Sequence, residues 1–312
     1  MKQCVDRRVF LKSAIGSAAA LSLSQMQPRT ALARGSAEPV TASPLNESLT
    51  VFSGVGCNVV AARDGANLAL VDGGLEERSA DLLKAVQHAF GRAPVRTLFN
   101  THWHPEQTGS NERLGKDGTT IISHENTRLW LGYANPVPAQ PGRTYGPLPP
   151  KARPSKTMYA SQKLQIGDEP VECGYLLQAH TDGDIYVFFR KSNVLVTGGA
   201  VSGAGWPIVD YQTGGWILGM VDGLRTLISL ADDNTRIVPA NGPLLKRADL
   251  EAQRSMYATI ADRLTKLLRQ GLGPDEVVAR APTAEFDAKW GDPKQFVTLA
   301  FQSLWGHMAP DS

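Results

Sequence analysis

The segment at residues 101–107, Thr-His-Trp-His-Pro-Glu-Gln, constrains the fold strongly because it directly follows a short apolar run at residues 95–99. The run predicts a buried strand that delivers His102 and His104 just past its end. In extended backbone, side chains two residues apart share a face, so both imidazoles can reach one metal ion while Trp103 points away. We therefore expect a fold in which a strand end opens onto a metal site.

Strand-like and helical segments alternate along most of the chain. Apolar runs at residues 49–62 and 67–71 flank the hairpin signal Arg63-Asp64-Gly65, and residues 76–90 have helical spacing. Further strands are expected at 119–123, 175–179, 185–189, 194–197 and 237–239, and further helices at 106–114, 125–131, 216–230, 248–269 and 295–305. This order predicts an α/β architecture with sheets inside and helices outside.

The first 33 residues are typical of an export signal. Residues 6–12, Asp-Arg-Arg-Val-Phe-Leu-Lys, form a twin-arginine pattern, and a mildly apolar stretch at 14–23 leads to a small-x-small cleavage site at 31–33. A disordered basic tail is the alternative. We expect export by the twin-arginine route to the periplasm, and no run in the sequence reaches the length of a membrane span.

The charge balance changes once such a signal is removed. The whole chain has 32 basic and 30 acidic residues, and residues 1–33 contain five of the former and one of the latter. The remainder carries a net charge of −2, which gives no reason to expect nucleic acid or an anionic membrane as a partner. A small-molecule substrate is expected instead, and the sequence leaves the oligomeric state open.

The rest of the chain divides into a linker and one domain. Residues 34–48 are rich in Pro, Ser and Ala and predict a linker, and residues 49–312 predict the domain, with its C-terminal helices from about 247. Residues 132–157 hold many prolines and glycines, which predicts either disorder or a functional flap. Cys57 and Cys173 would enter an oxidising compartment, where they either pair or stay buried as small apolar side chains.

A third histidine completes the expected metal site. His180 follows another apolar run, in the segment Ala-His-Thr-Asp-Gly-Asp at 179–184. Zinc accepts imidazole nitrogens, and three protein ligands leave a fourth position for water. His102, His104 and His180 are therefore expected to bind one Zn²⁺ ion, although three histidines would also accept iron, nickel or copper.

At this point the chain resembles the metallo-β-lactamase superfamily. The matching landmarks, in the family's order, are Asn58, Val71-Asp72-Gly73-Gly74, Thr101-His102-x-His104, Gly109 with Asn111, His180-Thr181, the strand at 194–198 and the turn at 238–243. They cover about residues 49–245. The resemblance implies a four-layer αββα sandwich with metals at one edge between the two sheets.

The departures from the family pattern fall on one metal position. The family motif H-x-H-x-D-H has Glu106 and Gln107 at its last two places, the usual G-D pair reads Gly198-Gly199, and the usual P-G-H-G-P turn has Asn241 in place of its histidine. Two neighbouring divalent cations need anionic ligands to offset their repulsion. The resemblance therefore implies that the three-histidine position is kept and that a second tightly bound zinc is absent.

Several polar residues near these motifs have open roles. Glu106 is a candidate general base, a fourth metal ligand, or an acidic residue at the start of a helix. Asp184 either orients a ligand histidine or belongs to a turn, and Asp72 is expected to hold the metal loop through backbone hydrogen bonds. Asn241 and Gln107 either donate to a substrate oxyanion or pack at a vacated site. His124 follows another predicted strand, and it either caps a helix or packs in the core, which is the expected role, or lies near the pocket.

These observations lead to one expected function and two alternatives. The first is an exported one-zinc hydrolase in which a zinc-bound water attacks an ester, lactone or thioester carbonyl, with Glu106, Asn241 and Asp184 as catalytic candidates. The second is a non-catalytic metal-binding or ligand-binding accessory protein of the periplasm. The third is a degenerate member of the same fold without metal.

Overall fold

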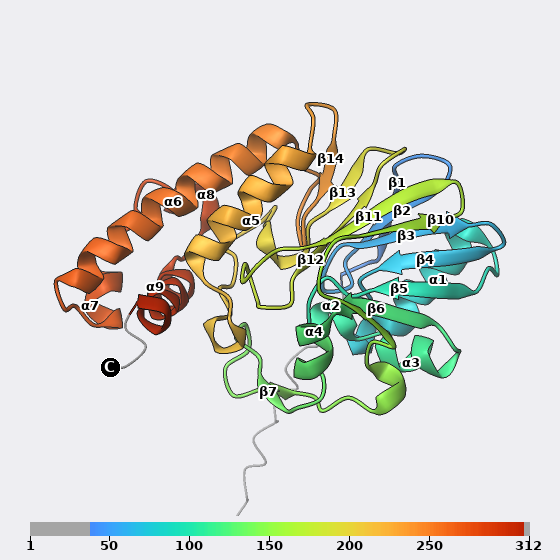
Figure 1. The fold of residues 1–312 in the computed structure, drawn as a ribbon, viewed down its shortest axis with the longest axis horizontal. Coiled ribbons are helices and arrows are strands. Elements are labelled where there is room, and N and C mark those ends of the chain that lie inside the picture. The colour runs from blue at the N-terminus through green and yellow to red at the C-terminus, as the bar shows by residue number, and fades with distance from the viewer. Residues whose placement is uncertain (1–37, 309–312) are drawn as a thin grey trace, which may run out of the picture. The chain divides into compact units, whose positions relative to one another are not determined.

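The structure, a computed structural model, describes residues 38–308, so the predicted export signal at 1–33 lies outside the described residues. Two mixed β-sheets form the centre of this part of the chain (Figure 1). The first sheet has the order β1 (Thr41–Pro44), β2 (Leu49–Ser53), β3 (Val59–Asp64), β4 (Asn67–Val71), β5 (Val95–Phe99), β6 (Thr120–His124) and β9 (Lys156–Met158). The second has the order β10 (Gln162–Ile166), β11 (Glu169–Tyr175), β12 (Ile185–Phe189), β13 (Val194–Val196) and β14 (Arg236–Val238).

Helices connect and cover these strands. They are α1 (Ser79–Phe90), α2 (Pro105–Thr108), α3 (Asn111–Lys116), α4 (Glu125–Trp130), α5 (Ile217–Leu230), α6 (Arg247–Arg269), α7 (Pro274–Ala279), α8 (Asp287–Trp290) and α9 (Lys294–Met308). Short 3₁₀ turns occur at Glu76–Arg78, Pro150–Ala152, Gly198–Ala200 and Tyr211–Thr213. No helix within residues 38–308 is both long and apolar enough to cross a membrane.

The strands bury side chains on both faces, which explains the layers. Along β12, Val187 and Phe189 pack between the two sheets, while Tyr186 and Phe188 face the core shared with α5, α6 and α9. The outer face of the first sheet packs against α1 through its buried Leu82. Because successive residues of a strand point to opposite faces, this gives the predicted helix–sheet–sheet–helix order.

Some predicted elements differ from those observed. The predicted strand at 49–62 is two strands, because Gly54 and Gly56 adopt positive φ angles and turn the chain between β2 and β3. The predicted strand at 175–179 is wrong: β11 ends at Tyr175, and residues 176–184 form a loop. Of the apolar residues in that loop, Leu176 and Ala179 are buried in the core shared with α5, whereas Leu177 is 66% exposed.

Two segments that the sequence predicted as a linker and a flap contain regular structure. Within the predicted linker, residues 41–44 form β1, which pairs antiparallel with β2. The predicted flap carries a hairpin of β7 (Asn135–Pro136) and β8 (Thr144–Tyr145). The flap is held at both sides, since Gln295 of α9 donates to Pro138 O at 2.7 Å and Thr108 donates to the Tyr145 hydroxyl at 2.9 Å.

Candidate metal centre

Three histidine side chains converge at one edge between the sheets. His102 and His104 lie on the loop that follows β5, and His180 lies on the loop that follows β11. All three are buried, at 1%, 6% and 4% exposed, and one nitrogen from each lies within 4.8 Å of the others. The structure thus brings together the three histidines that the sequence predicted as ligands.

Each histidine of the cluster has an inner ring nitrogen, which faces the other histidines, and an outer ring nitrogen, which contacts an oxygen atom. The contacts of the outer nitrogens identify the inner ones. His104 Nδ1 and His180 Nε2 face each other at 3.0 Å. His102 uses Nδ1 for a 3.1 Å contact with Thr101 Oγ1, which leaves Nε2 as its inner nitrogen. Three lone-pair donors pointing at a common space form the kind of ligand set that a divalent metal ion uses.

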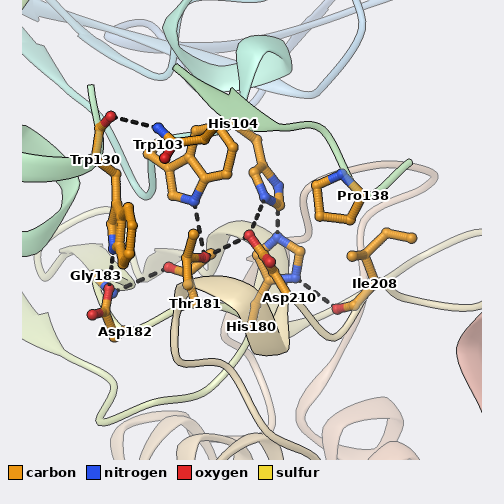
Figure 2. A network of polar contacts seen from close by, with 12 residues as sticks. Trp103, His104, Trp130, Pro138, His180, Thr181, Asp182, Gly183, Ile208 and Asp210 are labelled. Atoms are coloured by element: carbon orange, nitrogen blue, oxygen red, sulfur yellow. Dashed lines mark hydrogen bonds and ion pairs between the residues drawn. The ribbon is translucent and has the colours of Figure 1, made fainter. Parts of the chain in front are cut away.

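Each outer nitrogen contacts an oxygen atom, as Figure 2 shows for His104 and His180. His104 Nε2 lies 3.0 Å from Asp210 Oδ2, and His180 Nδ1 lies 2.7 Å from the Ile208 carbonyl. The Thr101 hydroxyl that contacts His102 donates in turn to Asp72. Metal-binding histidines in proteins usually have such partners, which fix the ring orientation and the tautomer.

Asp210 links the His104 ring to the Thr213 hydroxyl in this network. Its carboxylate also accepts from the Thr213 hydroxyl, which in turn accepts from Trp103 Nε1 at 3.0 Å. Burial acts to raise the pKa of Asp210, but the hydrogen bond and charge of His104 outweigh it and hold that pKa below its usual value. Sequence reasoning missed Asp210 because no spacing relates it to the histidines.

Two of the three histidines, His102 and His180, have pKa values that favour the neutral imidazole. Burial lowers the pKa of His102, and the neighbouring His180 and His104 lower it further. Burial is also the largest cause that lowers the pKa of His180, and the neighbouring His104 lowers it further. Neutral imidazoles keep their lone pairs for coordination, so the donor set fits a metal ion such as zinc.

Asp72 anchors the loop that carries two of the histidines. Its carboxylate accepts from the Thr101 backbone N–H at 2.8 Å and from the Thr101 hydroxyl. Burial raises the pKa of Asp72 to about 7, while the hydrogen bonds from Thr101 act in the opposite direction. The contact with the loop backbone is the role expected for this residue from the sequence.

Asp184 lies behind the site and does not line the cavity. It accepts from the backbone N–H groups of His180 and Thr181 and from the Thr181 hydroxyl. Burial raises its pKa to about 7. Asp184 therefore shapes the turn that carries His180 through its backbone N–H group, and it does not contact the imidazole ring.

The three histidines line a cavity of about 210 Å³ that is also lined by Glu106, Gln107 and Asn241. Glu106 accepts from Gln140 of the flap at 3.3 Å, and the Asn241 side-chain oxygen accepts from Ser202 at 2.9 Å. The structure thus places two of the three predicted catalytic residues, Glu106 and Asn241, beside the histidines.

Gly199 stands where the related motif has an acidic residue. A Cβ atom built on Gly199 would lie 2.2 Å from Cδ2 and 2.6 Å from Nε2 of His180. The His180 ring therefore occupies the space that a side chain at position 199 would need. No anionic ligand can be supplied from this position without moving His180.

His124 and the two buried cysteines lie outside the lining of this cavity. His124 caps α4 by accepting from the Asn126 N–H at 3.2 Å, and its ring stacks on Tyr175 with centroids 4.1 Å apart. Cys57 and Cys173 are both buried and unpaired. Capping and packing are thus the observed contacts of His124.

The contact between Asp210 and His104 makes a first prediction. In the Asp210→Asn variant, the carboxylate that orients the His104 ring is replaced by a neutral group of the same size, and we expect zinc affinity to fall by about 10–100-fold. Competition with a chromophoric chelator measures this. Asp222→Asn, on the exposed face of α5, is the matched control. Equal affinities in the two variants would contradict the role of Asp210.

Comparisons with known proteins agree with this architecture. Residues 53–255 match the model of the Metallo-beta-lactamase superfamily. Among solved structures, a metallo-beta-lactamase from Pontibacter korlensis is 16% identical with a TM-score of 0.56, covering 70% of this chain and 99% of that one. The DIM-1 metallo-beta-lactamase is 17% identical with a TM-score of 0.57, covering 71% and 98%, and VMB-1 is 15% identical with a TM-score of 0.57, covering 72% and 99%. No curated protein matches the chain.

Proposed function

We propose, from the premise that this chain belongs to the metallo-beta-lactamase superfamily, that it is a hydrolase using one zinc ion to cleave an ester, lactone or thioester. The observation that carries this proposal is the convergence of three buried histidines, each of which has an oxygen partner at its outer ring nitrogen. An accessory protein that binds a metal without catalysis would need no general base in its cavity, and Glu106 supplies one.

The proposal of a single metal ion rests on the residues at the second position. Gln107 and Asn241 are neutral and are weak ligands for zinc. Gly199 supplies no ligand, and His180 fills the adjacent space. A second divalent ion would therefore meet the charge of the first with Glu106 as the one carboxylate, among the described residues that line the cavity, to offset it.

Zinc in a three-histidine shell supplies Lewis acidity toward a carbonyl oxygen or a water molecule. Side chains of the protein supply the proton transfer and the donor to the oxyanion. Glu106 is the cavity's carboxylate, so we assign to it the transfer of a proton from the attacking water to the leaving group. Gln140 donates to Oε1 of Glu106 and so orients the carboxylate. The bond from Ser202 engages the oxygen of the Asn241 amide, which keeps its N–H end for a developing oxyanion.

The Glu106→Gln variant tests this assignment. Glutamine keeps the size of the side chain but cannot take a proton, so we expect kcat to fall by about 10²–10⁴-fold with zinc content unchanged. Stopped assays on p-nitrophenyl esters, lactones and thioesters, with metal analysis of the same samples, measure both quantities. Glu125→Gln, at the first turn of α4, is the control. If the wild-type protein holds zinc and hydrolyses none of these compounds, the hydrolase proposal is wrong.

Export to the periplasm is proposed on the sequence alone. The twin-arginine pattern at residues 6–12, the apolar stretch and the cleavage site occur in the order that such signals use. Replacing Arg7 and Arg8 with lysine should retain the chain in the cytoplasm, which cell fractionation would detect.

A further inference from the structure

A second cavity, of about 200 Å³, lies between the loop at residues 202–205 and the C-terminal helices. Helix α6 contributes Met256 to its lining, and the other side is formed by Phe286, which precedes α8, and Trp290, which ends α8. These three residues lie beyond residues 53–255, which match the family model. The C-terminal helices of this chain therefore build much of this second cavity, which we call the C-terminal cavity to distinguish it from the metal cavity lined by the three histidines.

The two cavities meet at Ser202, which lines both of them. The Ser202 hydroxyl donates to the side-chain oxygen of Asn241, which belongs to the metal cavity, at 2.9 Å. Gln253, which belongs to the C-terminal cavity, donates from Nε2 to the Ser202 carbonyl at 2.9 Å and accepts from the Ser202 N–H at 3.4 Å. The residue shared by the two cavities is thus fixed by one residue from each.

Small residues follow Ser202 along the boundary. Gly203, Ala204 and Gly205 line the C-terminal cavity, and Ala204 and Gly205 are exposed. A Cβ atom built on Gly205 would meet nothing within 4 Å, so the space beside this residue is open. The boundary at residues 203–205 therefore carries no side chain larger than a methyl group to obstruct an extended ligand.

The walls of the C-terminal cavity are largely apolar. Met256 and Trp290 are buried, and Leu245 and Phe286 are partly buried against the same hydrophobic core. Methionine adapts its shape to an irregular neighbour, and aromatic rings offer large apolar surfaces. Such walls favour a hydrocarbon group over a polar one, because the apolar surface of both partners leaves water.

The charged residues of this cavity oppose each other. Among the described residues that line it, the charged ones are Asp249 and Lys289. The Asp249 carboxylate accepts from the Lys246 N–H at 2.8 Å at the start of α6, and the exposed Lys289 ammonium lies 5.4 Å from the centre of the Trp290 ring. Because their charges have opposite signs, the C-terminal cavity offers no net charge to a ligand, which again favours an uncharged hydrocarbon group.

From these contacts we infer that the substrate carries an unbranched apolar acyl chain, which extends from the metal cavity across residues 203–205 into the C-terminal cavity. This inference rests on the proposed hydrolase function and names its substrate class. The metal cavity of about 210 Å³ and the C-terminal cavity of about 200 Å³ are each smaller than the about 300–1,000 Å³ typical of small-molecule sites, whereas together they fall within that range.

Three esters of increasing chain length test the inference on the zinc-loaded protein. They are p-nitrophenyl acetate, p-nitrophenyl butyrate and p-nitrophenyl hexanoate. Moving one methylene group from water into an apolar cavity favours binding by about fourfold, so we expect kcat/KM to rise by about two- to fourfold per methylene from butyrate to hexanoate. A value of kcat/KM that does not rise from butyrate to hexanoate would overturn the inference.

The Ala252→Phe variant places a ring in the C-terminal cavity. Ala252 lines this cavity from α6 and is exposed, so the larger side chain does not disturb the buried face of the helix. We expect the ratio of kcat/KM for hexanoate to that for butyrate to fall to about one, because the chain loses its apolar site. Ala258→Phe, also exposed on α6 but outside the lining of the cavity, is the matched control. Equal ratios in the two variants, at equal zinc content, would contradict a role for this cavity.

The Ala204→Trp variant tests the path between the two cavities. It puts a bulky side chain at an exposed position of the boundary, outside the lining of the metal cavity. We expect the preference for hexanoate over butyrate to be lost here too, since the chain can no longer cross. Ala258→Trp is the control for the added side chain. If Ala204→Trp keeps the preference of the wild-type protein, the path across residues 203–205 is wrong.

Binding measurements separate this inference from the hydrolase proposal. Ligand-observed NMR compares butyramide with hexanamide on the zinc-loaded wild-type and Ala252→Phe proteins. If no ester is cleaved but hexanamide binds more tightly than butyramide to the wild type alone, the hydrolase proposal falls and the C-terminal cavity stands as a site for an apolar chain. If hexanamide binds no more tightly than butyramide to the wild type, the inference falls, whatever the esters show.

Discussion

His102→Ala is expected to abolish tight zinc binding and, with it, all zinc-dependent hydrolysis. Loss of a ligand removes more affinity than the about 10–100-fold expected for loss of a ligand's hydrogen-bond partner. The loop itself should persist, because the Thr101 N–H and hydroxyl keep their bonds to Asp72 in the variant. Metal analysis after gel filtration measures the effect directly.

Thermal unfolding gives an independent measure of the same change. Zinc that binds the native state stabilises it by about 2.7 kcal/mol when its free concentration is 100 times Kd, so the Tm of the wild-type protein should rise with added zinc. The Tm of the His102→Ala variant should not change when zinc is added. His88→Ala, at an exposed position of α1, is the matched control and should respond like the wild type. One zinc retained by His102→Ala would refute the three-histidine site.

Gly199→Asp is expected to damage the existing metal position rather than create a second one. Aspartate is what the family motif has at this place, yet its Cβ would lie 2.2 Å from the His180 ring. His180 is held by the Ile208 carbonyl, so a shift of the ring breaks that bond. Overpacking of this kind costs about 1–3 kcal/mol. We expect both a lower Tm and weaker zinc binding.

Gly306→Ala provides the control, because a Cβ there meets nothing within 4 Å. Metal titration followed by mass spectrometry under native conditions counts the bound ions in each variant. A Gly199→Asp protein that binds two zinc ions with an unchanged Tm would show that the second position needs only a carboxylate, and our explanation of its loss would be wrong.

The family and the layered fold could be predicted from the sequence because both depend on local patterns. Strands such as β12 are apolar on successive residues, since one face packs between the sheets and the other against helices. His102 and His104 follow a strand end, and their two-residue spacing is readable without any tertiary information. The same patterns predicted a strand at 175–179, where Leu176 and Ala179 are instead buried from a loop.

The partners of the histidines could not be predicted, because they are set by how one loop returns to the site. Asp210 lies 106 residues after His104, and Ile208 contributes a carbonyl that any residue type would carry. The clash at Gly199 likewise depends on the position of the His180 ring, which no spacing specifies. Close contacts between distant segments thus limit what a single sequence reveals about this site.

The loop at residues 206–210 both lines the metal cavity and orients two of the ligand histidines. Trp206, Pro207 and Ile208 form the apolar wall of the cavity, while the Ile208 carbonyl and the Asp210 carboxylate orient His180 and His104. A change that reshapes the wall for a new substrate therefore also moves the groups that hold the ligands in place. In directed evolution, variants of this loop that accept new substrates should need a higher zinc concentration for activity. Variants at Ala139 of the flap, which also lines the cavity, should not.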